Sequence, residues 1–272
     1  MSLNLFSQQI APDLFGGLAA LLYLLYLWLQ LRSEAIESFP NRRVAALIAP
    51  AIGMHLIYTV LIVSTGSGII LSIWSSAIVM TFVAMVCTFY LYLVQGYRVL
   101  ALVTVPLAII SLFIGLLLTP ADGTLIDQAT VIAHVLISML TYATLGLAAV
   151  QAASIIVLHQ RLKKNDSTAF VKLMPPLQTV EATAMHLLWL GVSLLTLTVV
   201  TGLIFRWDFV QQGNYVLHMG LALTCWVLYL ALICGQLWFG WRGQISARLS
   251  LLAFAILLIS YFGLQFVFGY GT

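Results

Sequence analysis

Five histidines are the side chains of this sequence best suited to chemistry in an apolar environment. An ionisable side chain inside a membrane span is costly unless it faces the protein interior and meets a partner. His134 and His218 each lie about one helical turn into a long apolar stretch. Both stretches are expected to enter the membrane from the same side, so we expect the two imidazoles at matching depth on facing helices. Axial ligation of a porphyrin iron requires this geometry.

The residues near this pair suit a non-covalently held haem b. Aromatic rings that could line an apolar slot occur at Phe205, Trp207, Tyr142 and Trp226, and the cation of Arg206 could pair with the propionates. The sequence has no Cys-x-x-Cys-His motif with which to attach a haem covalently. We therefore expect the two histidines to be iron ligands and both Trp207 and Arg206 to contact the cofactor.

A simpler interpretation of His134 remains open. Intramembrane histidines often hydrogen-bond to the next helix and stabilise the bundle by about 0.6 kcal/mol per bond. Ser138 and Thr141 follow His134 at helical spacing, which predicts a polar stripe that faces protein rather than lipid. This stripe indicates burial of His134 under either interpretation.

His55 is expected about halfway through another apolar stretch. Tyr58 and Thr59 follow it at helical spacing on the same face. Because a histidine at this depth is poorly explained as an interfacial anchor, two roles stay open. One is a structural hydrogen bond, and the other is holding or passing a cofactor. His55 is therefore a further candidate for cofactor binding.

Composition identifies the environment of these histidines. The chain has 272 residues, of which 62% are hydrophobic and 7% are charged. Soluble domains carry about 25% charged residues, so a soluble globular domain is excluded. The net charge of +3 is scattered between apolar runs, which argues against nucleic acid as a partner. We expect a polytopic membrane protein in contact with the lipid bilayer.

The apolar stretches predict an all-α bundle of about eight transmembrane helices. A span needs about 20 apolar residues, and continuous runs of this length are unlike the alternation of a membrane β-barrel. The chain shows no separate domain, so we expect one integral membrane domain over residues 1–272. The expected spans are Leu14–Leu31, Val44–Ser64, Ile69–Val94, Val99–Leu118, Thr130–His159, Thr183–Phe205, Tyr215–Phe239 and Leu249–Phe268.

The positions of the cations predict the orientation. Ten of the eleven lysines and arginines fall between spans on one side, and Arg206 falls on the other. An excess of Lys and Arg marks the cytoplasmic side. Both termini are therefore expected on the outer, periplasmic side, together with Asp13, Asp122, Asp127 and Asp208. This orientation places His134 and His218 near the outer face.

Four stretches of the chain resemble the cytochrome c assembly family of haem-handling membrane proteins, in its compact branch of YpjD-like and HemX-like proteins. The resemblance covers nearly the whole chain, and the order and spacing of the stretches make it specific. They are His134–Ala143, Met174–Glu181, Leu194–Gly202 and Gly240–Gly243.

This resemblance implies a haem-binding or haem-translocating role in the biogenesis of c-type cytochromes, with haem presented on the outer face. It implies that His134 is an axial ligand and that His55 matches a histidine of this branch in the second span. His218 has no such counterpart, so its role rests on the depth argument. The tryptophan-rich block of larger relatives is reduced to Trp207-Asp208. The expected partners are haem, other maturation proteins and apocytochrome c.

Other functions stay open at this point. The HemX-like branch also implies a regulatory role in tetrapyrrole synthesis, and a structural membrane subunit would need no ligand. A small-solute permease should show paired broken helices in corresponding halves of the chain, and no such pairing is evident. We assign no independent catalytic activity to the chain.

Overall fold

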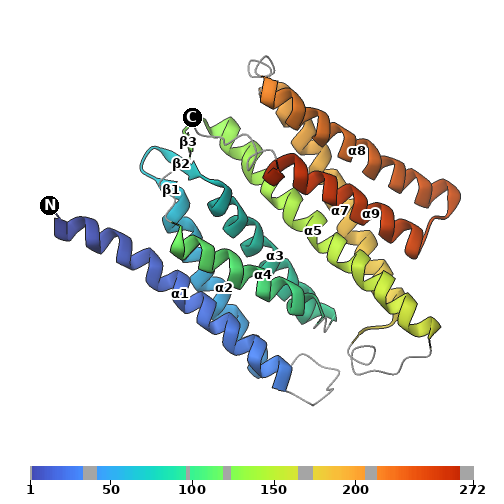
Figure 1. Cartoon of the computed structure of the whole chain (residues 1–272), viewed down its shortest axis with the longest axis horizontal. Helices are drawn as coiled ribbons and strands as arrows, with labels where there is room; N and C mark the ends of the chain where they lie inside the picture. Colours follow the sequence, from blue (N-terminus) through green and yellow to red (C-terminus); the bar gives the residue numbers. More distant parts are fainter. Residues whose placement is uncertain are drawn as a thin grey trace. The chain divides into compact units, whose positions relative to one another are not determined.

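The computed structural model describes residues 2–32, 42–95, 99–118, 124–164, 174–205 and 213–263. These residues form eight α-helices, a π-helical turn and one small sheet (Figure 1). The helices are α1 (Ser2–Arg32), α2 (Arg42–Val63), α3 (Ile73–Gln95), α4 (Val99–Leu117), α5 (Ala129–Lys163), α7 (Leu177–Phe205), α8 (Gly213–Phe239) and α9 (Gln244–Leu258), and the π-helical turn is η2 (Ile259–Gly263).

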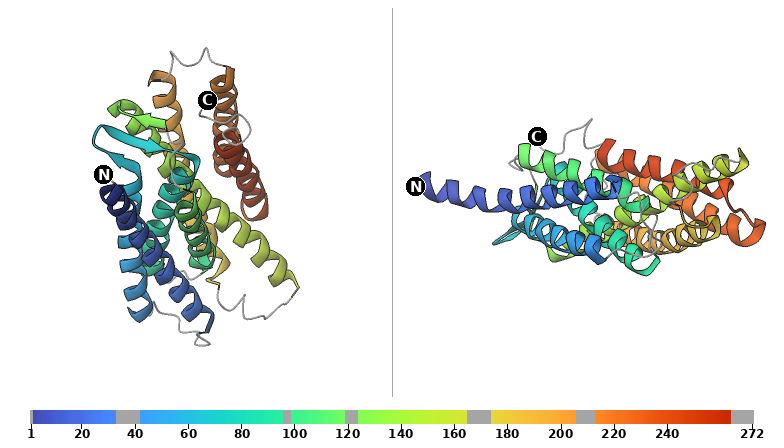
Figure 2. Two further views of the ribbon diagram at one scale, coloured as in Figure 1. Left: turned by 60° about the vertical axis from the view of Figure 1, so that its left-hand side comes forward. Right: turned by 90° about the horizontal axis from the view of Figure 1, so that it is seen from below.

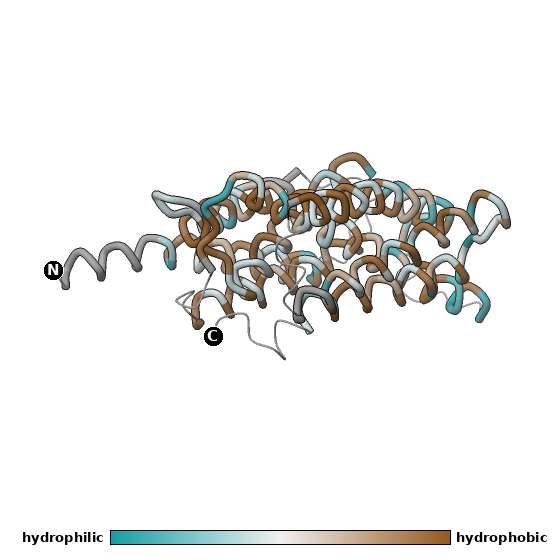
Figure 3. The backbone as a smooth tube through the Cα atoms, turned by 90° about the horizontal axis from the view of Figure 1, so that it is seen from above, coloured by the Kyte–Doolittle hydropathy of each residue, from teal (hydrophilic) through white to brown (hydrophobic). Residues whose placement is uncertain are grey.

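The lengths of these helices confirm the all-α polytopic prediction. Within the described ranges, seven helices are long and apolar enough to cross a membrane, and α2 contributes the shorter apolar segment Leu47–Val63. Hydrophobic residues run along the helices in Figure 3. In hydrocarbon, a helix satisfies its backbone hydrogen bonds internally, which is why such sequences form helices there.

The chain divides into two compact units. Unit 1 comprises Met1–Asp127 and holds α1 to α4 with the sheet, and unit 2 comprises Gln128–Thr272 and holds α5, α7, α8, α9 and η2. The views in Figure 2 show the antiparallel helices of each unit.

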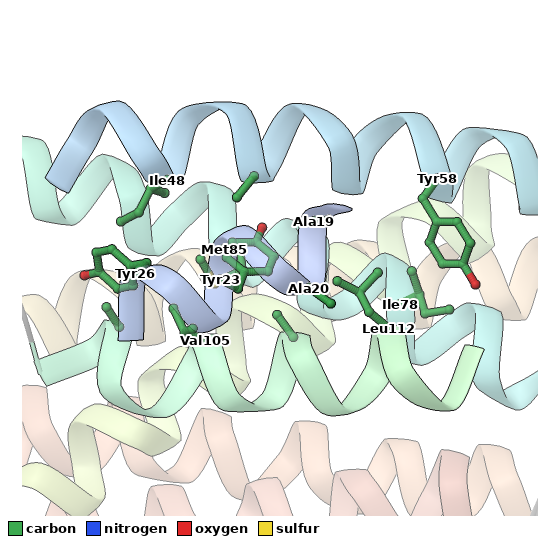
Figure 4. Packing of buried hydrophobic residues seen from close by; sticks show 13 residues of the cluster. Ala19, Ala20, Tyr23, Tyr26, Ile48, Tyr58, Ile78, Met85, Val105 and Leu112 are labelled. Carbon is green, nitrogen blue, oxygen red and sulfur yellow. The ribbon is translucent and has the colours of Figure 1, made fainter. Parts of the chain in front are cut away.

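Unit 1 is a ring of four helices. Helix α1 packs against α2 and α4, and α3 packs against the same two helices. Five alanines let the helices approach closely around two tyrosines, Tyr23 and Tyr26, which are fully buried. Side chains from all four helices converge on this core in Figure 4. They include Ala19, Ala20, Ile48, Tyr58, Ile78, Met85, Val105 and Leu112.

A three-stranded antiparallel sheet corrects the expected start of the third span. Its strands are β1 (Ser64–Thr65), β2 (Gly68–Leu71) and β3 (Thr124–Ile126). The span was expected from Ile69, but Ile69 pairs with Ile126 in the sheet and α3 begins at Ile73. Apolarity alone does not separate a strand from a helix, and here pairing with a distant segment decides the outcome.

Unit 2 is also a ring of four helices. Helix α5 packs along α7 and against α9, and α8 packs against α9 and α7. Within the part of unit 2 that the structure describes, α5 and α8 form no extended packing with each other. They therefore occupy diagonally opposite corners of the ring.

Candidate functional site

His134 lies on α5, five residues after Ala129, the first residue of the helix. Its Nδ1 atom is 2.8 Å from Oγ1 of Thr201 on α7. Gly202 follows Thr201 and provides room for the ring, because a Cβ there would stand 3.2 Å from Cε1 of His134. The imidazole thus lies against a small-residue face of α7.

The polar stripe expected below His134 faces protein, as predicted. Thr141 is fully buried, and its hydroxyl lies 3.0 Å from that of Thr198 on α7. The Ser138 hydroxyl donates to the carbonyl of His134 at 2.7 Å. Helices α5 and α7 are therefore tied together by polar side chains along the face that bears His134.

His218 lies on α8, five residues after Gly213, where α8 begins. Its Nδ1 atom is 2.6 Å from the carbonyl oxygen of Ser260 and 3.2 Å from the Ser260 hydroxyl. Ser260 is fully buried and belongs to the π-helical turn η2. π-Helical turns are rare and occur frequently at functional sites.

The two histidines lie at the same end of unit 2, which we call the histidine end. Both are the same number of residues from the start of their helices. Their partners support this placement, because Thr201 is near the end of the antiparallel α7 and Ser260 follows the end of α9. Diagonal helices of a four-helix bundle both face its centre, and cofactor sites are commonly built there.

Two of the aromatic residues predicted to line the haem slot lie farther from the histidine end of unit 2. The Tyr142 hydroxyl donates to the carbonyl of Leu257 and joins α5 to α9. The indole of Trp226 donates to the Thr196 hydroxyl at 3.0 Å and joins α8 to α7. Both side chains thus link adjacent corners of the ring below the histidine end.

The remaining predicted contacts at this end cannot be placed. Arg206 and Trp207 lie outside the described residues, and Phe205 ends α7 without a described side chain. The prediction that these residues contact a cofactor therefore stays a prediction.

His55 lies in unit 1 and is fully buried. Its Nδ1 atom is 3.4 Å from the hydroxyl of Tyr23, and its ring meets Phe82 edge-on at 5.6 Å. Among the described residues, the Nε2 atom has no hydrogen-bond partner, although the carbonyl of Ile78 lies nearby. Tyr58 and Thr59 are buried on α2 as well. This imidazole belongs to a different unit from His134 and His218.

Two hydroxyls of α7 were not predicted from the sequence: that of Thr201, which contacts His134, and that of Thr198, which contacts Thr141. Thr198 and Thr201 lie one turn apart within the apolar run of α7, and this spacing was the available signal. The role of Ser260 depends on the path of the chain after α9, which local sequence does not specify.

The donor set at the histidine end fits a macrocyclic metal complex better than a bare ion. No group of three or more His, Cys, Asp or Glu side chains that could hold a metal occurs among the described residues. A pair of imidazoles at one end of a helical bundle suits a metal whose other four ligands come from a porphyrin. The residue types at the histidine end are therefore compatible with haem, and ligation of haem by His134 and His218 stays a prediction.

Several known proteins are similar in sequence to part of this chain. The chain is 34% identical over 134 residues to inner membrane protein YpjD of Escherichia coli K12, and the match spans 49% of this chain and 50% of YpjD. It is 26% identical over 163 residues to protein HemX of Brevibacillus brevis, over 57% of each chain. An uncharacterized 28.8 kDa protein of Azospirillum brasilense is 28% identical over 137 residues, 49% of this chain and 50% of its own length.

The match to YpjD thus covers about half the length of that relative. No solved structure shows a significant match. The model of the Cytochrome C assembly protein family matches residues 12–270 and extends across both units. The chain therefore belongs to the cytochrome c assembly family.

Proposed function

We propose that this protein binds haem b non-covalently at the histidine end of unit 2 and acts in the biogenesis of c-type cytochromes. The observation that carries the proposal is the placement of His134 and His218. They lie at the same end of one four-helix ring, on diagonal helices, and each Nδ1 atom is hydrogen-bonded to a different neighbouring helix.

The chain's own residues would hold the haem by ligation and burial. His134 and His218 would bind the iron, and Arg206 and Trp207 would contact the propionates and the ring edge. The threonines of α7 would keep the His134 ring in place. The intact haem would be the group that an apocytochrome later receives.

The location and partners of the protein follow from the same proposal. The resemblance to an inner membrane protein and the apolar helices support a multi-pass protein of the bacterial inner membrane. The histidine end would face the periplasm by the positive-inside bias. Partner proteins would supply apocytochrome c and keep its thiols reduced, and His55 would be a waypoint within unit 1.

Haem titration of the purified protein tests the proposal. We expect a low-spin Soret band with one haem per chain, and we expect His134→Ala and His218→Ala each to abolish the low-spin spectrum. His159→Ala is the matched control, because His159 is an exposed histidine on the same helix as His134. This variant should keep the wild-type spectrum.

Two results would contradict the proposal. One is wild-type protein from haem-replete cells that neither contains nor takes up haem, which favours a structural subunit. The other is a low-spin spectrum that survives both substitutions at the histidine end but disappears in His55→Ala, which would move the site to unit 1.

A further inference from the structure

We infer that Thr201 and Ser260 hold His134 and His218 as Nδ1–H tautomers, so that each ring presents Nε2 as its metal-binding nitrogen. The inference deepens the proposed function and rests on it for its purpose, although the tautomers themselves are properties of the protein without haem. Thr201 is thereby a positioning residue that acts through His134.

The tautomer of His218 follows from the identity of its partner. Nδ1 of His218 lies 2.6 Å from the carbonyl oxygen of Ser260. A carbonyl oxygen only accepts hydrogen bonds, so Nδ1 must carry the proton. The Ser260 hydroxyl is directed at the carbonyl of His218, at 3.3 Å, and its oxygen lies 3.2 Å from Nδ1.

The tautomer of His134 follows from the single proton of the Thr201 hydroxyl. That hydroxyl lies in donor geometry to the carbonyl of Leu197 at 2.8 Å and to the carbonyl of Thr198 at 3.1 Å. Because its proton is directed at the backbone of α7, its oxygen is left to accept from Nδ1–H of His134 at 2.8 Å.

This arrangement has a consequence for metal binding. Neutral histidine in water prefers to carry its proton on Nε2, where it would block ligation through that atom. A hydrogen-bond acceptor at Nδ1 reverses this preference and fixes the ring orientation. The Nδ1–H tautomer is therefore favoured in both histidines, by a side chain of α7 at His134 and by the backbone of η2 at His218.

Of the two hydrogen-bond acceptors, only the Thr201 hydroxyl can be removed by a substitution. The carbonyl of Ser260 is a backbone atom and remains after any side-chain substitution. The hydroxyl of Thr201 can be removed by Thr201→Val, which keeps the branched shape, or retained by Thr201→Ser. Thr224→Val is the matched control, because Thr224 on α8 is exposed and makes the same bond to its own helix, with Gly220.

Nitrogen NMR of protein containing 15N-labelled histidine, without haem, reads the tautomers directly. The His134 signals are assigned by their loss in His134→Ala. We expect Nδ1–H for His134 and His218 in the wild type, in Thr201→Ser and in Thr224→Val. In Thr201→Val we expect His134 to shift toward Nε2–H while His218 is unchanged. An Nε2–H tautomer of His134 in the wild type would overturn the inference, and once the signals are assigned this outcome is read from the wild-type protein alone.

Haem titration of the same variants separates this inference from the proposed function. Loss of a partner behind a metal ligand weakens binding by about 10- to 100-fold, so we expect a loss in this range for Thr201→Val and near wild-type affinity for Thr201→Ser. Unchanged affinity in Thr201→Val would overturn the positioning role. If the wild type binds no haem but shows the expected tautomers, the proposed function fails and the tautomer assignment stands.

Discussion

Cε1 of His134 lies 3.2 Å from the point where a Cβ on residue 202 would stand. Gly202 therefore lets the ring approach the backbone of α7 more closely than any other residue type would. The same helix turn supplies the Thr201 hydroxyl that bonds to the ring. The position of the imidazole is thus set by two consecutive residues of α7.

Gly202→Ala should weaken haem binding with little loss of stability. The added methyl would displace the His134 ring by a few tenths of an ångström from the position in which it would bind the iron. We expect this to cost haem binding about 1 kcal/mol, which is about fivefold in affinity by haem titration. Gly220→Ala on α8 is the control, because a Cβ there meets nothing within 4 Å. Equal affinities in the two variants would show that Gly202 does not shape the site.

Gly191→Ala should destabilise unit 2. A Cβ at this position would overlap the side chain of Leu145, at the place where α7 and α5 pack together. Overpacking of this kind costs about 1–3 kcal/mol, which thermal unfolding in detergent would detect. The double variant Gly191→Ala/Leu145→Ala should lose less than the sum of the two single changes, since the new methyl fills the space vacated by the leucine. Strict additivity would contradict this packing.

The turn between α8 and α9 should depend more on Gly235 than on Gly240. The ring of Trp241 covers the backbone at Gly235 and leaves no room for a Cβ, and the Trp241 amide donates to the Gly235 carbonyl at 3.2 Å. Gly240 has a φ of 65° but open space around it, so Gly240→Ala should cost only about 1 kcal/mol of strain. Gly235→Ala should cost about 2–3 kcal/mol. Comparison of the two melting temperatures checks the order, and a reversed order would contradict it.

His55→Leu should keep or raise the stability of unit 1. A buried polar atom without a hydrogen bond costs about 1–3 kcal/mol, and Nε2 of His55 is such an atom. The substitution also leaves the buried Tyr23 hydroxyl without its 3.4 Å contact to His55, a cost that offsets part of this gain. Thermal unfolding measures the net change in stability, and a marked loss would show that the imidazole has a structural role. Unchanged stability together with reduced haem content would favour the waypoint role.

The sequence predicted the helical class well because the bilayer constrains it strongly. Long apolar runs have one main way to satisfy their backbone in hydrocarbon, and α3, α4 and α5 confirm it. The exception was the segment after Thr65, where Gly68–Leu71 is apolar but forms strand β2. Its partner β3 lies more than 50 residues away, and a local pattern does not reveal such pairing.

The candidate site was predictable only in part. Histidine type and distance from the start of an apolar run placed His134 and His218 at one end of the bundle. Nothing in those distances predicted that Thr201 and Ser260 hold the rings, because both contacts join residues more than 40 positions apart.

By itself, the sequence determined that this chain forms apolar helices and which of them bear histidines, since hydrophobicity and helical rise act along the chain. The tertiary structure decided which neighbours each imidazole meets. It set α5 and α8 at diagonal corners and brought a threonine and a π-helical carbonyl to the two Nδ1 atoms. Helix packing depends on the close fit of side chains between segments distant in the chain, and spacing along one segment does not determine that fit.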